Sequence, residues 1–221
     1  MTSTMKKTYI CGLLLLLLNV AQGFAQQVTD FEWDVYNSEA YITGYVGTSS
    51  DVVILEVING MPVTSIGEAA FSGKQLTSVT IPSSIRAIDF YAFEYNCLTG
   101  VIIPDGVWAI GQGAFQNNQL TSITIPDSVT WIRGSAFAGN QLTSITIPPG
   151  ATIESYAFKS NPITSITIGA DVSFMPEGRI LNSILGGRFE GSFDQLYENG
   201  GRLAGTYTRP NPESTVWTRE D

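Results

Sequence analysis

Two short motifs recur along this chain at a fixed interval, and this periodicity constrains the fold more than any other feature. The first motif, Leu-x-x-Ile-x-Ile-Pro or a close variant, starts four times at intervals of 22 residues and a fifth time after 21. The second motif, Ile-x-x-x-Ala-Phe, recurs in register with the first, from Ile66 to Ile153. Because one such repeat cannot bury its own apolar side, the pattern predicts a solenoid with one coil per repeat.

Within one repeat the first motif alternates as a β-strand does. In the copy that begins at Leu120, Ile123 and Ile125 are expected to point inward, while Ser122 and Thr124 point outward. Pro126 then ends the pairing because proline has no backbone N–H.

Three further columns are expected to form the interior. The small-residue column contains Ala70, Ala92, Ala114, Ala136 and Ala157. The column expected to stack one ring per coil contains Phe71, Phe93, Phe115, Phe137 and Phe158. The polar column contains Asn96, Asn118, Asn140 and Asn161. We interpret these asparagines as a structural ladder that bonds the turn backbone and neighbouring asparagines, not as a ligand site.

The two ends of the chain differ from the repeats. Residues 1–25 have a basic start, an apolar run and a small-residue end, which predicts a signal peptide and therefore export. Residues 26–59 are expected to form an N-terminal β cap and lead-in, with a hairpin over 27–45 that turns at Asn37 and Ser38. Its first strand should be half-buried, with inward Phe31, Trp33 and Val35 alternating with Asp30, Glu32 and Asp34. The five coils follow over 60–168.

The sequence after the coils is less regular. Residues 169–188 are expected to form a C-terminal cap or linker, with a short helix over 177–185. Residues 189–221 are expected to form a small β module, a three-stranded meander with strands over 193–197, 202–207 and 215–218. We interpret this tail as a cap, and a sorting or attachment signal is the alternative.

Charge and composition exclude several classes of function. The whole chain carries a net charge of −9, and nine basic residues remain against 20 acidic ones once the signal peptide is removed. This balance argues against a nucleic-acid partner or an anionic membrane surface. No second apolar run is long enough to span a membrane. We therefore expect no transmembrane segment in the mature chain.

The residues needed for most enzymatic chemistry are missing from the sequence. The chain contains no histidine, which removes the commonest general base and most zinc sites. Cys97 is the only cysteine after the signal peptide, so it is either an inert surface thiol or the link of a disulfide-bonded dimer. Asp105 and Asp127 occupy the same turn of adjacent coils and form the one candidate carboxylate pair. Their neighbours are typical of tight turns, so we predict no catalysis, cofactor or metal.

The combined pattern L-x-x-I-x-I-P…I-x-x-x-A-F-x-x-N resembles the BspA-type (Treponema-type) bacterial leucine-rich repeats. The resemblance covers residues 53–168 and is specific, because both motifs recur five times in register. It implies a leucine-rich-repeat solenoid with one short strand per coil, between a β-hairpin cap and a small β module. It also implies an exported or surface protein that binds proteins of a host or neighbouring cell.

Two sets of residues are candidates for partner binding. The outward strand positions form one face, which in leucine-rich repeats generally is the partner-binding face. The aromatic candidates occupy positions where the scaffold requires none, and exposed aromatics are favoured interface anchors. Trp108 and Trp131 are offset by one residue between adjacent coils, so the pattern allows contact between them. The candidates are Ser78, Thr80, Ile102, Ser122, Thr124, Ser144, Thr146, Ser165 and Thr167 on the strands, and Phe90, Tyr91, Tyr95, Trp108 and Trp131 among the aromatics.

The leading hypothesis is an exported, non-enzymatic, adhesin-like module that binds a host matrix or neighbouring-cell protein. It would be located at the cell surface, in the periplasm or in the medium, and dimerisation through an open end is a further hypothesis. The alternative is a structural or passenger repeat protein of the envelope without a specific ligand. A third hypothesis is a carbohydrate-active enzyme that uses Asp105 and Asp127.

Overall fold

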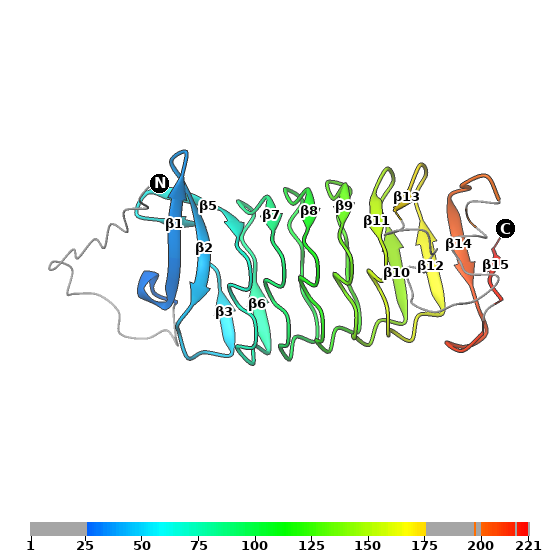
Figure 1. Cartoon of the computed structure of the whole chain (residues 1–221), viewed down its shortest axis with the longest axis horizontal. Helices are drawn as coiled ribbons and strands as arrows, with labels where there is room; N and C mark the ends of the chain where they lie inside the picture. The colour runs from blue at the N-terminus through cyan, green and yellow to red at the C-terminus, as the bar shows by residue number, and fades with distance from the viewer. Residues whose placement is uncertain (1–25, 176–196, 198–199, 215, 221) are drawn as a thin grey trace, which may run out of the picture.

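The chain folds as a β-solenoid, seen from the side in Figure 1. The computed structural model describes residues 26–175, 197, 200–214 and 216–220. The predicted signal peptide and the predicted helix over 177–185 lie outside these residues. Coils one to five begin at Ile66, Ile88, Ile110, Ile132 and Ile153, and stack in the order of the sequence. The predicted repeat solenoid is therefore confirmed.

One continuous sheet runs along the whole solenoid, and we call it the back sheet. Its strands pair in parallel from β2 onward, because equivalent segments of successive coils lie side by side. The antiparallel strand β4 (Val57–Ile58) joins it only through β5. In order, the sheet contains β1 (Phe31–Tyr36), β2 (Glu39–Tyr45), β5 (Met61–Ile66), β7 (Ala87–Ile88), β8 (Ala109–Ile110), β9 (Trp131–Ile132), β11 (Thr152–Glu154) and β13 (Ser173–Met175).

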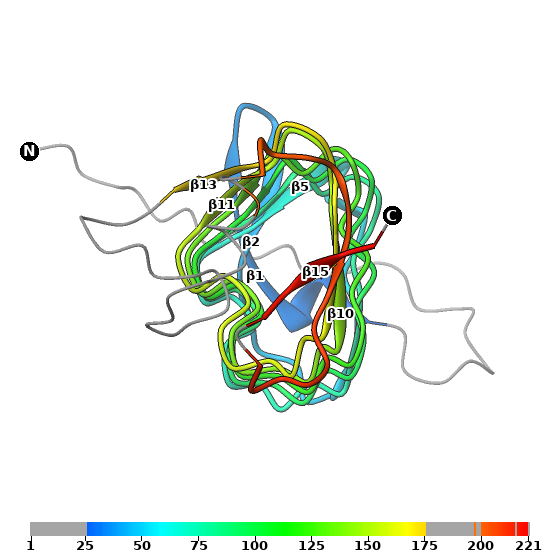
Figure 2. The same cartoon turned by 90° about the vertical axis from the view of Figure 1, so that its right-hand side faces the viewer.

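The opposite side of the solenoid carries the predicted Leu-x-x-Ile-x-Ile strands, and we call their outward surface the front face (Figure 2). In coils two and three this segment is reduced to a single bridge between Ile102 and Thr124. Gly100 lies in the interrupted segment, and glycine weakens a strand because it has no side chain to pack. The front strands are β3 (Asp51–Val53), β6 (Ser78–Thr80), β10 (Ser144–Ile147), β12 (Ser165–Ile168), β14 (Gly205–Thr208) and β15 (Thr218–Arg219).

The predicted phenylalanine column forms the centre of the core. Each of the rings, from Phe71 to Phe158, is fully buried. Neighbouring rings stack nearly parallel, with centroids 5.0 to 5.4 Å apart. The alanines that precede them are at most 2% exposed, so this column admits only a small side chain. The stack buries one large apolar side chain per coil and extends through all five coils.

The asparagine column is confirmed as a structural ladder, but its bonding differs from the prediction. Asn118 accepts a hydrogen bond from the Leu98 amide and donates to the carbonyl oxygens of Phe93 and Phe115, at 2.8 to 3.2 Å. Asn96, Asn140 and Asn161 repeat this arrangement. Each amide therefore fastens the backbone of its own coil to the preceding coil. It does not bond the next asparagine, because these backbone groups already satisfy it.

The predicted N-terminal hairpin is present and closes one end of the core. A short 3-10 turn, η1 (Val28–Asp30), precedes β1, and β1 pairs with β2 in antiparallel fashion. Asn37 and Ser38 turn the chain with φ of 50° and 63°, the left-handed region that this tight turn requires. Tyr45 stacks on Phe71 at 5.5 Å and so extends the ring column into the cap. The predicted burial of Val35 is wrong, because it is 44% exposed near the hairpin tip.

The other end of the solenoid is extended by the tail. β13 pairs with β11 in the register of a further coil, so the coil pattern continues beyond residue 168. β14 adds to β12 in antiparallel fashion, and β15 pairs with β14. These two strands of the predicted meander lie close to their predicted positions. Of the predicted strand over 193–197, only Tyr197 lies within the described residues.

Candidate functional site

The front face is a regular array of hydroxyl groups, as the alternation of the motif predicts. Ile123 and Ile125 are buried, whereas Ser122 and Thr124 are exposed. The same holds along Ser78, Thr80, Ser144, Thr146 and Thr167, and Ser165 is half-buried. The array continues onto β14, where the Thr206 and Thr167 hydroxyls are 3.0 Å apart. None of these front-face positions carries a charge.

Coil two departs from the uniform surface of the other coils. Within coils one to five, every exposed large apolar side chain belongs to coil two. These side chains are Phe90, Tyr95, Ile102 and Trp108, with exposed fractions of 40%, 61%, 81% and 53%. We call these four residues the coil-two band. They are distributed around the perimeter of the coil, with Ile102 on the front face and Trp108 just before the back strand β8.

The other coils carry polar or small residues at the same four positions. Coil three has, in the same order, Gln112, Asn117, Thr124 and Thr130. These equivalences follow from the register of the stacked coils and from the repeat itself. Since coil three folds with polar residues there, the scaffold does not require the apolar residues of the coil-two band.

Tyr95 also adopts an unfavourable backbone conformation. Its φ is 53°, in the left-handed region, where glycine and asparagine are the usual residues. The equivalent positions in coils three and four are Asn117 and Gly139, which suit this conformation. A bulky residue in this region costs roughly 1–3 kcal/mol. The Tyr95 side chain is 61% exposed, so packing offsets little of this cost.

Tyr91, in contrast, has a packing role. It also has a positive φ, 57°, but its ring is half-buried and lies over Gly113 of the next coil. Its hydroxyl accepts a hydrogen bond of 2.8 Å from the side-chain amide of Gln112. Tyr91 therefore links coils two and three, and is less free to contact a partner than Tyr95.

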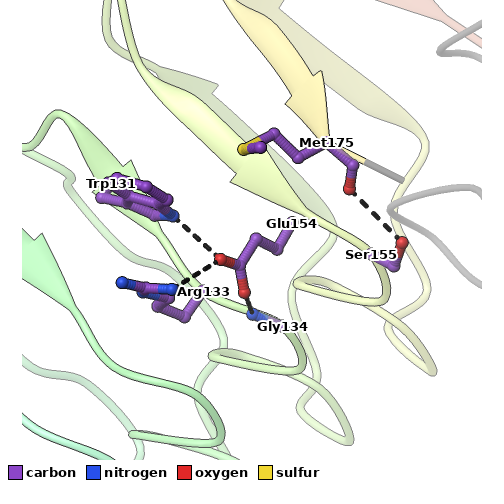
Figure 3. A network of polar contacts seen from close by, with 6 residues as sticks. All are labelled: Trp131, Arg133, Gly134, Glu154, Ser155 and Met175. Carbon is purple, nitrogen blue, oxygen red and sulfur yellow. Dashed lines mark hydrogen bonds and ion pairs between the residues drawn. The ribbon is translucent and has the colours of Figure 1, made fainter. Parts of the chain in front are cut away.

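Trp131 lies in a polar network on the back sheet (Figure 3). Its indole N–H donates to Glu154 at 3.0 Å, and the Arg133 guanidinium stacks over its ring at 4.3 Å. Arg133 forms an ion pair with Glu154 at 3.0 Å, and the Gly134 amide donates to the same carboxylate at 2.9 Å. Trp131 is half-buried and held in place by side chains of the next two coils. The sequence did not reveal this network, because its members are separated along the chain.

Trp108 and Trp131 lie next to each other in adjacent coils. The Trp108 carbonyl accepts a hydrogen bond of 3.3 Å from the Trp131 amide. Their rings do not form an aromatic pair. The Trp131 side chain is directed to Arg133 and Glu154, and Trp108 is exposed at the preceding corner.

The remaining candidates lie on turns and loops. Asp105 and Asp127 are both exposed on turns. Cys97 is a free, half-buried thiol. Burial raises the pKa of Glu94 above its ordinary value. Among the residues that the structure describes, no cluster of three or more His, Cys, Asp or Glu side chains could hold a metal ion.

The stacked coils, the parallel back sheet and the asparagine ladder define a solenoid protein of the leucine-rich-repeat class. A family model for the BspA type leucine rich repeat region matches residues 64–183, more than half of the chain, with six copies. The protein therefore belongs to this family of bacterial repeat proteins, which are generally not enzymes. The six copies are one more than the repeat motifs predict, and β13 lies where a further coil begins.

Solved structures of similar proteins support this fold. A leucine-rich repeat protein from Bacteroides ovatus is 27% identical, with a TM-score of 0.51 over 63% of this chain and 41% of that protein. This chain therefore spans less than half of the length of that protein. A leucine rich repeat protein from Treponema pallidum is 23% identical, with a TM-score of 0.50 over 69% of this chain and 83% of that one. No curated protein matches the sequence. Across the described part of the chain, no helix has the length and hydropathy needed to cross a bilayer.

Proposed function

We propose that this protein is an exported, non-enzymatic repeat module that binds another protein through the coil-two band. The observation that carries the proposal is the concentration of exposed apolar side chains in one coil. The other four coils provide an internal control, since they have the same scaffold without such side chains. Exposed aromatic side chains are favoured at protein-binding surfaces.

The chemistry of the band fits a protein interface. Tryptophan and tyrosine carry much of the binding energy at such interfaces, because they offer a large apolar area with few rotatable bonds. Trp108 and Tyr95 are more than half exposed, so both rings are available to a partner. The surrounding front face is flat and uncharged, which would form a polar rim around Ile102.

Export is supported by the predicted signal peptide over residues 1–25. The family's repeat domains generally mediate protein interactions, which agrees with the proposed binding role. The partner we expect is a protein of a host matrix or a neighbouring cell. The repeated serines and threonines of the front face would then contribute complementarity, and the band most of the affinity.

A graft of coil-three residues onto coil two tests this proposal. The variant carries Phe90→Gln, Tyr95→Asn, Ile102→Thr and Trp108→Thr, so each new residue already occupies that position in coil three. Wild type and variant would be used to capture partners from host serum, matrix and bacterial envelope extracts. Circular dichroism would confirm that both are folded. We expect the wild type to retain a partner that the folded variant loses.

The control variant carries Glu68→Gln and Ser160→Asn, at the exposed positions equivalent to Phe90 and Tyr95 in coils one and five, and should bind as the wild type does. Retention of the same partner by the coil-two graft would contradict the proposal. Capture of no partner by either protein would favour the passenger hypothesis. In that case, deletion of the tail from residue 189 onward should change the location of the protein in cells.

A further inference from the structure

The junction between the N-terminal hairpin and the first coil contains a pocket that the repeat pattern does not explain. Its volume is about 310 Å³, near the lower end of the range for small-ligand sites. This volume suits one compact group, such as the end of a long side chain or a small amine. The wall consists of Tyr36, Glu39, Ala40 and Tyr41 of the hairpin, and of Thr64 and Ser65 of β5.

The pocket lies where the register between β2 and β5 shifts. Ala40 pairs with Val63 and Tyr41 pairs with Ser65, so Thr64 has no partner in the ladder. Such bulges redirect side chains and are frequent beside binding sites. Here the Thr64 hydroxyl donates to one Glu39 carboxylate oxygen, Oε2, at 3.0 Å. The carboxylate is thereby fixed in the wall of the pocket.

The other oxygen of Glu39, Oε1, is available to a ligand. Among the described residues, no group donates a hydrogen bond to this oxygen. The ion pair in this part of the chain joins Arg133 and Glu154, so Glu39 has no cationic partner there. The cap adds negative charge around it, because residues 26–59 contain six acidic residues and no basic one. A fixed, uncompensated carboxylate in such surroundings attracts a cation.

The two tyrosines add a second interaction for a cation. Tyr36 and Glu39 are directly opposite each other in the hairpin, so one phenol ring stands beside the carboxylate. Tyr41 is opposite Asp34. Burial raises the pKa of Tyr41 above its ordinary value, and the charge of Asp34 and a hydrogen bond to Asp34 raise this pKa further. The face of the Tyr41 ring carries the negative quadrupole that attracts cations.

We propose that this pocket binds an organic cation, with its ammonium or guanidinium group against the rings of Tyr36 and Tyr41 and on the free oxygen of Glu39. A free amine and the side chain of a lysine or arginine share this chemistry. The site lies on the cap, apart from the coil-two band, and does not depend on the proposed protein-binding function. Each of the two inferences can fail while the other holds.

Nuclear magnetic resonance titration of the protein from Gln26 onward tests the proposal. The probes are n-butylammonium, Nα-acetyl-lysine amide and its uncharged counterpart Nα-acetyl-norleucine amide, with methyl glucoside as a neutral sugar. We expect both cations to produce saturable shifts at the amides of Tyr41, Thr64 and Ser65, with millimolar affinity that weakens in high salt. The norleucine compound and the sugar should produce no saturable shift there.

Two conservative variants locate the interaction. Glu39→Gln keeps an acceptor for Thr64 but removes the charge, and should weaken binding by about tenfold or more. Tyr36→Leu keeps an apolar side chain but removes the ring, and should weaken binding by about two- to tenfold. Glu56→Gln removes a cap carboxylate that lies outside the pocket and likewise accepts a hydroxyl, from Ser83, so it should leave the affinity nearly unchanged.

Several results would overturn the proposal. Equal binding of the norleucine compound would show that the charge is irrelevant, and unchanged affinity of a folded Glu39→Gln variant would remove its carboxylate from the site. Saturation by the sugar but not by the amines would assign the pocket to carbohydrate. The comparison of lysine and norleucine compounds uses the wild-type protein, so it stands even if a variant does not fold. Binding of the lysine amide but not of n-butylammonium would assign the site to a peptide side chain and reject free amines.

Discussion

Replacing Asn118 with alanine removes the amide that fastens coil three to coil two. The Leu98 amide, which is fully buried, loses its acceptor Asn118 Oδ1, 3.1 Å away. An unsatisfied buried donor costs about 1–3 kcal/mol. The carbonyl oxygens of Phe93 and Phe115 each lose one donor but keep another, from Asn96 and Asn140. At about 0.5 kcal/mol for each of these two bonds, the total loss of unfolding free energy is about 2–4 kcal/mol.

Urea unfolding followed by circular dichroism would measure this loss, and amide hydrogen exchange would locate it. The Leu98 amide should lose most of its protection, whereas amides in coils four and five should change little, since repeats interact mainly with their neighbours. Gln119→Ala, an exposed neighbour, is the matched control and should change stability by less than about 0.5 kcal/mol. If Asn118→Ala is as stable as this control, the ladder does not hold the coils together and the reasoning is refuted.

Three further substitutions test other parts of the structure. Phe115→Ala should lower the unfolding free energy by about 3–5 kcal/mol. Phe115→Leu should lower it by clearly less, because leucine refills most of the cavity, and equal losses in urea unfolding would contradict this expectation. Glu154→Gln should lower the unfolding free energy by about 1–2 kcal/mol and change the fluorescence of Trp131, since one acceptor for the surrounding donors is lost. An unchanged emission spectrum and an unchanged urea midpoint would show that the network is not formed in solution. Burial raises the pKa of Glu94, so the folded protein favours its protonated form. Glu94→Gln should therefore stabilise the protein at pH 7, and this gain should disappear as the pH falls below about 4, where the carboxyl is protonated in both states. A loss of stability at pH 7 would indicate favourable contacts of the charged form.

Much of the fold was predictable because equivalent positions of a solenoid share one environment. The alternation of Ile123 and Ile125 with Ser122 and Thr124, the ring column and the N-terminal hairpin all follow from local patterns. The back sheet was not predicted, because each coil contributes only two or three residues to it and so short a segment has no readable period. The prediction for Val35 was wrong since alternation alone does not show where a hairpin extends beyond the core.

The candidate site was predictable only in part. Comparison of the repeats identified Phe90, Tyr95 and Trp108 as departures from the pattern and placed Ile102 on the outward face. It did not show that these four are the exposed large apolar residues of the coils. The same comparison made Trp131 a binding candidate alongside Trp108. Its indole is instead bound by Glu154, 23 residues further along, and stacked by Arg133. Which side chain meets another across coils depends on rotamers that the sequence does not specify.

The sequence by itself determined that this protein is a solenoid, how long its coils are, and which columns of residues form its interior. Stacking in register places each repeated position in the same surroundings, and the repeat can be recognised directly in the sequence. The tertiary structure alone decided which of the departures from that repeat are exposed, and that Tyr95 occupies a left-handed conformation. It alone revealed the pocket of Glu39 and Tyr41, because that pocket arises where an antiparallel hairpin meets a parallel sheet with a shifted register.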